Sequence, residues 1–199
     1  MSHIVFDGPA GKLEGYLDHG TSDKGAVLCH PHPLYGGSMD DMVLNALNAA
    51  FTATGFTTLR FNFRGVGTSE GSHEEGVGEV NDVLAAVDLL ERTEGCQNPI
   101  LAGYSFGGGM AIKAAAVTTC ERLILVAPPV RLFTDLEVPS QSALIILGES
   151  DQIVDANETA AWFEGKNTKT EIIPGTDHFF FGAHQKITEI AEEFLSNGA

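Results

Sequence analysis

A serine flanked by glycines is the part of this sequence best suited to chemistry. Ser105 stands in the middle of residues 103–107, GYSFG, directly after the apolar run 99–102 and before a segment rich in glycine and alanine. This order predicts a strand, a sharp turn and a helix, with the serine at the turn. A Cβ atom at Gly103 or Gly107 would collide with so tight a turn. The N-terminus of the following helix would favour negative charge beside the serine, so we interpret Ser105 as a candidate nucleophile.

A serine hydroxyl becomes a good nucleophile only when a base takes its proton and an acid orients that base. In an open α/β sheet, functional side chains follow the carboxyl ends of strands. Asp151 follows the predicted strand 143–147, and His178 follows the predicted strand 170–173. We therefore expect Ser105, Asp151 and His178 to form a catalytic group.

Other titratable residues nearby have simpler interpretations. Asp155 is close enough to Asp151 to be a rival acid, but we expect the first aspartate after the strand to be used. Asp177 is expected to shape the turn around His178, since adjacent side chains rarely face each other. The histidines at positions 3, 19, 73 and 184 are expected on the surface.

Apolar runs typical of strands alternate with helical patterns, which predicts an α/β fold with a largely parallel sheet. The expected strands are 3–6, 12–17, 25–29, 57–63, 99–102, 122–127, 143–147 and 170–173. The expected helices are 40–54, 78–92, one that follows Ser105, 157–164 and 184–196. The sequence contains no repeat and no segment with the character of a linker, so we expect a single domain over residues 1–199.

The order of Ser105, Asp151 and His178 along the chain is the order found in α/β-hydrolases. Further similar segments are 30–37 (HPHPLYGG), 61–71 (FNFRGVGTSEG), 103–107 (GYSFG), 148–151 (GESD) and 175–179 (GTDHF). Through these segments the chain resembles the α/β-hydrolase superfamily, and more closely its small, capless serine esterases near the dienelactone hydrolases, which carry a His-Pro-His-Pro loop.

This resemblance implies an eight-stranded, mostly parallel sheet with an antiparallel second strand, helices on both faces and no cap domain. The short connection 128–142 leaves little room for a cap. Dienelactone hydrolases carry cysteine at the position of Ser105, so their lactone chemistry is not carried over. Acyl transfer of the esterase type is the expected reaction.

Two backbone N–H groups are expected to bind the oxyanion of the tetrahedral intermediate. Phe106 supplies the first, because it follows the serine at the start of the helix. The resemblance implies that the loop after strand 25–29 supplies the second. Prolines in that loop have no N–H, which leaves His32 or Leu34, with Tyr35 less favoured.

Apolar side chains in the surrounding loops are expected to line an open site suited to a small acyl group. They are Leu34, Tyr35, Phe106, Val130, Leu132, Phe133 and Phe179. The expected substrate is a small-molecule ester with a short acyl chain. Thioesters, lactones and amides pass through the same type of tetrahedral intermediate and stay open as alternatives.

Two alternatives belong to other classes of function. His30 and His32 could share a zinc ion in a metal-dependent hydrolase, but no further ligand stands at the spacing of a known motif. A hydrolase-like protein that only binds ligands usually lacks part of the catalytic group, and this sequence has all three residues. We therefore expect an enzyme that needs no metal ion and no organic cofactor.

Composition excludes several kinds of partner. The net charge of −16, from 27 acidic and 11 basic residues, opposes binding to nucleic acid and to anionic membranes. No apolar run approaches the length of a membrane helix, and the first residues do not resemble a secretory signal. The three cysteines lack metal-type clustering, so reduced thiols and a cytoplasmic location are expected. The sequence does not indicate an oligomeric state.

Overall fold

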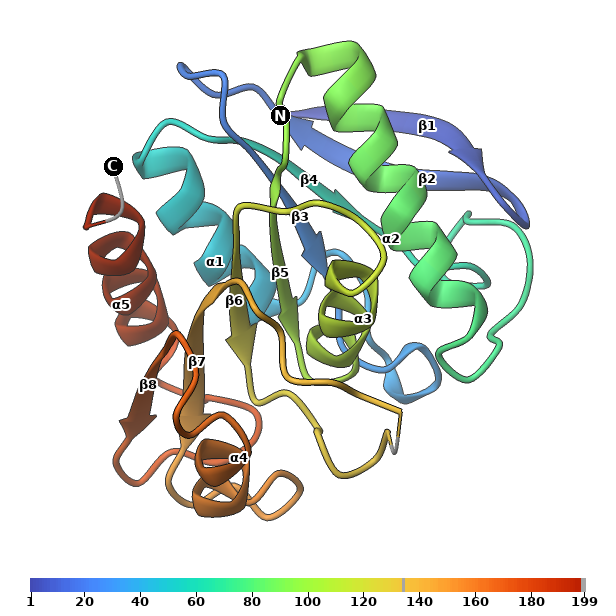
Figure 1. Ribbon diagram of the computed structural model, residues 1–199. Coiled ribbons are helices and arrows are strands. Elements are labelled where there is room, and N and C mark those ends of the chain that lie inside the picture. The colour runs from blue at the N-terminus through green and yellow to red at the C-terminus, as the bar shows by residue number, and fades with distance from the viewer. Residues whose placement is uncertain (134, 198–199) are drawn as a thin grey trace.

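An eight-stranded sheet forms the centre of the computed structural model, which describes residues 1–133 and 135–197 (Figure 1). The strands are β1 (Ser2–Gly8), β2 (Gly11–Asp18), β3 (Gly25–Cys29), β4 (Thr57–Phe61), β5 (Ile100–Tyr104), β6 (Arg122–Val126), β7 (Ser142–Gly148) and β8 (Thr168–Ile173). Thr134, inside the 128–142 connection, and the last two residues of the expected 1–199 domain lie outside the described residues.

The strands lie in the order β1-β2-β4-β3-β5-β6-β7-β8. β2 runs antiparallel to both β1 and β4, whereas the neighbours from β4 to β8 pair in parallel. The predicted mostly parallel sheet with an antiparallel second strand is therefore confirmed.

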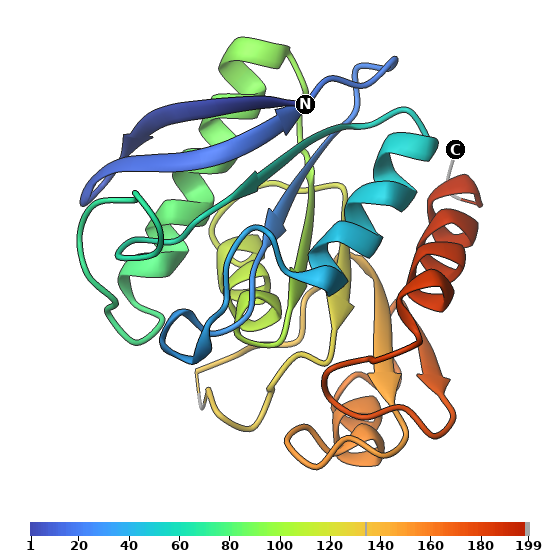
Figure 2. The same cartoon turned by 180° about the vertical axis from the view of Figure 1, so that it is seen from behind.

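Helices cover both faces of this sheet. They are α1 (Met42–Ala53), α2 (Gly78–Leu89), α3 (Phe106–Ala115), α4 (Ala156–Trp162) and α5 (His184–Ser196). α2 and α3 pack on the face nearest the viewer in Figure 1, and α1 and α5 lie side by side on the opposite face, which Figure 2 shows. None of the helices in the described part of the chain has the length and apolar character needed to span a lipid bilayer.

Two predicted helices have different boundaries in the structure. The expected helix 40–54 begins at Met42, because the Asp41 carboxylate accepts hydrogen bonds from the N–H groups of Val43 and Leu44. The expected helix 78–92 ends as an α-helix at Leu89 and continues as a π-helical turn to Glu94.

The central strands explain where functional residues gather. Every residue of β3, β4, β5 and β6 is buried, so these strands have helices or loops against both faces. β3, β5, β6, β7 and β8 run in the same direction, and the loops that follow them therefore lie along one edge of the sheet. Ser105, Asp151 and His178 all belong to loops at this edge.

Candidate active site

Ser105 occupies a strained turn between β5 and α3. Its backbone has φ 52° and ψ −122°, a conformation that residues with a Cβ atom rarely adopt. A Cβ atom on Gly103 would lie against the carbonyl oxygen of Gly107, and one on Gly107 would lie against that of Cys29. The sharp turn therefore needs glycine at both positions, because a Cβ atom would collide with the backbone, as the sequence predicts.

A chain of hydrogen bonds joins the three residues of the expected catalytic group. The Ser105 hydroxyl lies 3.0 Å from Nε2 of His178, and Nδ1 of His178 lies 2.7 Å from Oδ2 of Asp151. Because a carboxylate can only accept, these partners assign the proton of neutral His178 to Nδ1 and leave Nε2 free to accept from Ser105. The geometry is that of a nucleophile, a base and an orienting acid.

Asp151 is held rigidly in its ionised form. Its side chain is only 1% exposed, and its Oδ1 atom accepts from the N–H groups of Ile153 and Val154 at 2.8 Å each. Burial raises the pKa of this carboxyl, but the hydrogen bonds from His178 and from the two N–H groups outweigh burial, so the pKa lies below its usual value. Asp151 is thus a charged acceptor for the imidazole at neutral pH.

The two competing aspartates have local backbone partners. The Asp155 carboxylate accepts from the N–H of Glu158 at 2.8 Å and caps α4. The Asp177 carboxylate accepts from the N–H of Phe179 at 3.0 Å and shapes the turn that carries His178. Neither is among the groups that contact the imidazole of His178 by hydrogen bond in the described residues.

Hydrogen bonds within the loop after β3 distinguish between the candidate oxyanion donors. The N–H of Leu34 donates to Nδ1 of His32 at 3.2 Å, and the N–H of Tyr35 donates to the carbonyl oxygen of His32 at 3.1 Å. Within residues 1–133 and 135–197, the N–H groups of His32 and Phe106 have no acceptor in the protein. The rings of His32 and Phe106 lie 4.9 Å apart between centroids, so the two N–H groups belong to adjoining segments. Of the three expected donors in this loop, His32 is therefore the one whose N–H is not already used within the described residues.

His30 anchors the same loop. Its Nδ1–H donates to the carbonyl oxygen of Pro31 at 2.6 Å, and its Nε2 accepts from the N–H of Phe63 at 3.0 Å. Burial lowers the pKa of His30 to about 4, so the ring is neutral at pH 7. Both ring nitrogens already bind backbone groups, and a metal ion could reach this histidine only by displacing one of them. No cluster of three or more His, Cys, Asp or Glu side chains that could hold a metal occurs among the described residues.

Two residues lie near the site although the sequence does not predict them there. Tyr104 donates its hydroxyl proton to the carbonyl oxygen of His178 at 2.7 Å, and burial raises its pKa, which keeps the hydroxyl protonated. His73, expected on the surface, has a side chain only 10% exposed, 5.0 Å from the His32 ring. The expectation for His73 is wrong because its Nδ1 atom lies 2.7 Å from the buried carboxylate of Glu79, although without hydrogen-bond geometry.

The expected substrate-lining residues fall into two groups. Leu34, Tyr35, Leu132 and Phe179 are exposed at the catalytic edge. Val130 is buried in the core, and Phe133 is half-buried against Phe106 at 5.9 Å between ring centroids. The side chain of Phe106, also expected to line the site, is buried in the core as well. Among the expected lining residues, those of the first group are the ones that face solvent.

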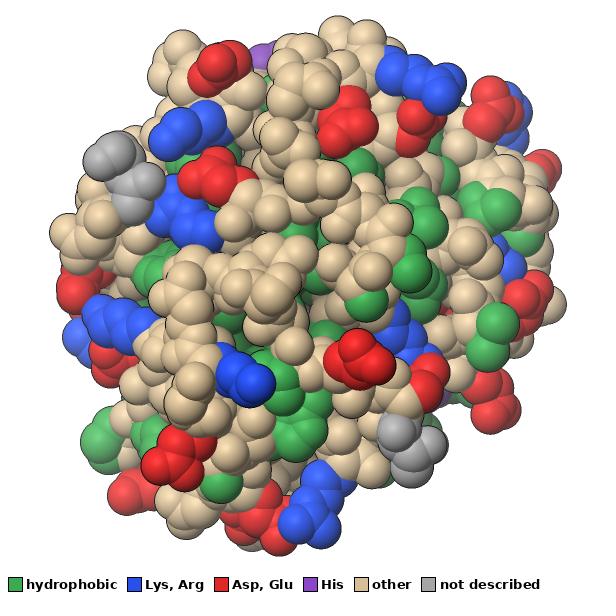
Figure 3. All heavy atoms as spheres, viewed as in Figure 1, with side chains coloured by type: hydrophobic (Ala, Val, Ile, Leu, Met, Phe, Trp, Pro, Cys, Tyr) green, Lys and Arg blue, Asp and Glu red, His purple; other side chains and the backbone are tan. Residues whose placement is uncertain are grey.

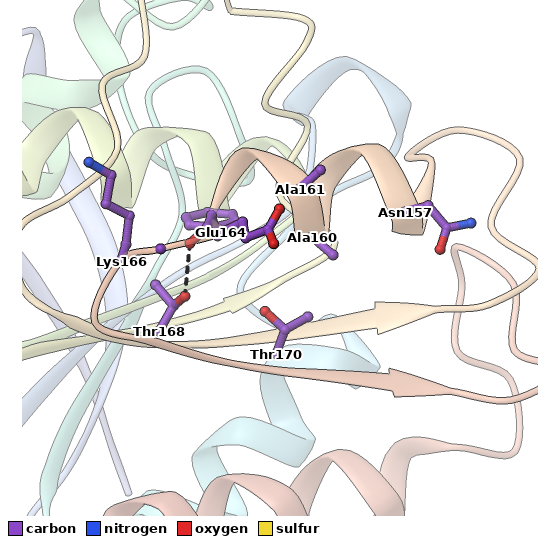
Figure 4. A pocket seen from close by; sticks show the side chains of 9 residues that line it. Asn157, Ala160, Ala161, Glu164, Lys166, Thr168 and Thr170 are labelled. Carbon is purple, nitrogen blue, oxygen red and sulfur yellow. Dashed lines mark hydrogen bonds between the residues drawn. The ribbon is translucent and has the colours of Figure 1, made fainter.

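Two cavities elsewhere do not include the catalytic group. One, of about 520 Å³, lies between α4 and β8, where Thr168 and Thr170 point toward the helix and Thr168 donates to the carbonyl oxygen of Phe163 (Figure 4). The other, of about 530 Å³, lies between α2 and α3. Ser105 itself is half-buried at the end of β5.

Comparisons with known proteins agree with this architecture. Residues 26–141 match the model of the alpha/beta hydrolase family, and the chain is 32% identical to an uncharacterized protein of Rickettsia prowazekii over 98% of this chain and 89% of that protein. The chain therefore belongs to the alpha/beta hydrolase family. The finer assignment to the branch near the dienelactone hydrolases stays a prediction.

Several solved structures are similar to this chain. An alpha-beta serine hydrolase homologue from Coxiella burnetii is 33% identical, with a TM-score of 0.92 and coverage of 98% of this chain and 97% of that one. A serine hydrolase without a lid from Xanthomonas campestris is 32% identical, with a TM-score of 0.92 and coverage of 99% and 94%. Est1E of Butyrivibrio proteoclasticus, solved with ferulic acid, is 21% identical with a TM-score of 0.85 over 98% of both chains, and shares the fold.

Proposed function

We propose that this protein is a serine hydrolase that cleaves small or short-chain carboxylic esters through an acyl-enzyme. The observation that carries the proposal is the hydrogen-bond chain from Ser105 through His178 to Asp151, with the serine on a strained turn. Its two bonds measure 3.0 and 2.7 Å, within the range required for proton transfer.

The first half of the reaction acylates the serine. His178 Nε2 takes the hydroxyl proton as Ser105 Oγ forms a bond to the carbonyl carbon of the ester. The carbonyl oxygen becomes an oxyanion, which accepts hydrogen bonds from the N–H groups of Phe106 and His32. Asp151 stabilises the imidazolium. The bond from the carbonyl carbon to the alcohol oxygen then breaks, and His178 gives its proton to the leaving oxygen.

The second half releases the acid. His178, again neutral, takes a proton from water as the water oxygen attacks the acyl carbon of the acyl-enzyme. The same two N–H groups bind the second oxyanion. The bond to Ser105 Oγ breaks, His178 returns the proton to the serine, and the carboxylic acid leaves. The residues of the chain supply every group that these steps require.

An ester substrate is favoured by the absence of a described cap and by the esterase Pf2001 of Pyrococcus furiosus, which has the same fold at 20% identity and a TM-score of 0.78. The described parts of the 128–142 connection, residues 128–133 and 135–141, contain no helix or strand that could act as a cap. Thioesters, lactones and amides react through the same type of tetrahedral intermediate, so the test compares them with esters.

The test is a substrate panel with a matched pair of serine variants. Ethyl esters of increasing acyl length, a thioester, a lactone and an amide are compared for the parent protein, Ser105→Ala and the exposed Ser72→Ala. Short-chain esters should react fastest, Ser105→Ala should lose activity and labelling by a fluorophosphonate, and Ser72→Ala should keep both. Activity that survives in Ser105→Ala and disappears with a chelator would instead support a metal-dependent hydrolase, and a preference for long-chain esters would contradict the predicted acyl size.

A further inference from the structure

Three consecutive phenylalanines follow the candidate base and alternate between solvent and core. Phe179 is 54% exposed and Phe181 is 78% exposed, whereas Phe180 between them is fully buried. Exposed phenylalanine side chains are unfavourable in water, and neighbouring ones often mark a binding surface. This pair stands directly beside His178 in the sequence.

The backbone of Phe180, which lies between the two exposed phenylalanines, has a strained conformation. Its φ of 54° lies in the left-handed region, which a bulky residue adopts only when its surroundings enforce it. Its ring packs edge-on against Tyr104 at 6.1 Å, and Tyr104 also binds the carbonyl oxygen of His178. The N–H of Phe180 donates to the carbonyl oxygen of Asp177 at 3.3 Å. Strain of this kind clusters at functional sites, and here it turns the two flanking rings outward.

The two outward rings form one surface that begins at the imidazole. Phe179 and Phe181 lie 5.9 Å apart between centroids with their planes 31° from parallel. The Phe179 ring stands edge-on to the His178 ring, at 5.9 Å and 83°. We call the exposed rings of Phe179 and Phe181 the aromatic pair.

The position of the aromatic pair indicates which part of a substrate it contacts. In the proposed reaction, His178 delivers its proton to the oxygen of the departing alcohol, so the alcohol part of the ester lies next to this imidazole. The acyl part lies instead toward the N–H groups of His32 and Phe106, which bind the carbonyl oxygen. A flat apolar group attached to the alcohol oxygen would cover the aromatic pair and remove its surface from water.

We propose that Phe179 and Phe181 bind the alcohol part of the substrate, and that this alcohol carries a flat aromatic ring. The inference rests on the proposed esterase function and adds the class of leaving group to it. Aromatic rings stack in offset or edge-on arrangements, which gives a planar alcohol an advantage over an alkyl alcohol of similar chemistry. Both rings are exposed, so substitutions at these positions leave the hydrophobic core intact.

The experiment compares kcat/KM for three esters that place the aromatic ring differently. Benzyl acetate carries the ring on the alcohol, methyl phenylacetate carries it on the acid, and ethyl acetate has none. Phe179→Ala and Phe181→Ala should each lower kcat/KM for benzyl acetate about tenfold, the effect of roughly one aromatic contact, and change the other two esters less than about threefold. Phe179→Tyr should retain the parent preference, and Val117→Ala, which removes an equally exposed side chain elsewhere, should change nothing.

Four results would overturn this inference. Equal losses on all three esters would mean a structural role for the aromatic pair, and losses confined to methyl phenylacetate would place the pair on the acyl side. A parent protein that cleaves all three esters without preferring benzyl acetate, and is unaffected by Phe179→Ala, would reject the inference while the esterase function stands. A parent protein that cleaves none of the three would reject the proposed function, and the inference with it.

Discussion

At the scale of single residues, Asp151 has the clearest assigned task. Its two carboxylate oxygens accept hydrogen bonds from His178 and from two backbone N–H groups. Asp151 therefore orients the imidazole ring of His178 and stays ionised beside it. Asp151→Asn presents an amide to the imidazole and favours the wrong tautomer. We expect kcat for ester hydrolysis to fall by about 10³ to 10⁴ with a much smaller change in KM. Steady-state kinetics on a short-chain ester measures this, and Asp155→Asn, which alters only the cap of α4, should keep kcat within a few fold.

His32 allows its backbone N–H to be tested separately from its ring. Its φ of −55° is already suited to proline, so His32→Pro removes the N–H without forcing a new backbone angle. His32→Ala keeps the N–H and removes only the ring that accepts from Leu34. We expect kcat to fall by about 10² to 10³ in His32→Pro and by much less in His32→Ala. Equal losses in both variants would show that the ring, and not the N–H, matters.

Some of the site could be predicted from residue types, and some could not. The proposed roles of Ser105, Asp151 and His178 follow from their order and from the strands that precede them, and in the structure hydrogen bonds join the three side chains. The choice between His32 and Leu34 depends on which N–H is used inside a 3₁₀ turn, which spacing alone does not determine. The burial of His73 likewise depends on Glu79, whose carboxylate is enclosed by backbone N–H groups of Glu74 and Gly76.

At the scale of elements, the strand-turn-helix that carries Ser105 depends on two close backbone approaches. Gly107→Ala would press a Cβ atom against the carbonyl oxygens of Cys29 and His30, neither of which can move without shifting the loop after β3. We expect the free energy of unfolding to fall by about 1 to 3 kcal/mol, together with a loss of activity. Urea unfolding measures the first effect. Gly108→Ala is the matched control, because its Cβ atom would lie 3.2 Å from Cβ of Pro128 and 3.4 Å from the carbonyl oxygen of Gly103, much longer distances than those at Gly107, and should change stability far less.

The elements themselves were largely predictable, and the differences have local causes. Apolar runs locate the buried strands well, because a strand covered on both faces is apolar along its whole length. The expected strand 57–63 ends at Phe61. The N–H of Asn62 still binds the carbonyl oxygen of Glu14 in β2, but the N–H of Phe63 binds the ring of His30 and no longer a neighbouring strand. These partners lie far away in the sequence, so no local pattern could have indicated them.

At the scale of the whole molecule, His30 links folding to pH. The pKa of the buried ring is about 4, against 6.5 for an exposed histidine, so the unfolded chain binds more protons between these values. Stability is therefore full above about pH 6.5 and decreases as the pH falls toward 4, by roughly 3 kcal/mol for this residue. Urea unfolding at several pH values measures the slope. His30→Gln should flatten the slope in this window, and an unchanged slope would contradict the assignment to His30.

The surface charge of the whole molecule bears on its partners. Acidic and basic side chains are interspersed on the face shown in Figure 3, with hydrophobic side chains exposed among them. The net charge of −16 favours uncharged or cationic small molecules over polyanions. An uncharged ester with an aromatic alcohol is compatible with this negative net charge and with the aromatic pair.

Trapping the acyl-enzyme tests most directly whether Ser105 is the nucleophile. The protein is mixed with p-nitrophenyl acetate, stopped with acid within the first turnover, digested and examined by mass spectrometry. We predict one acetyl group per chain, attached to Ser105, and none in Ser105→Ala or in a sample stopped after the substrate is exhausted. Continued hydrolysis with no acetyl group on Ser105, or an acetyl group on another residue that turns over at the catalytic rate, would contradict the assignment of Ser105 as the nucleophile.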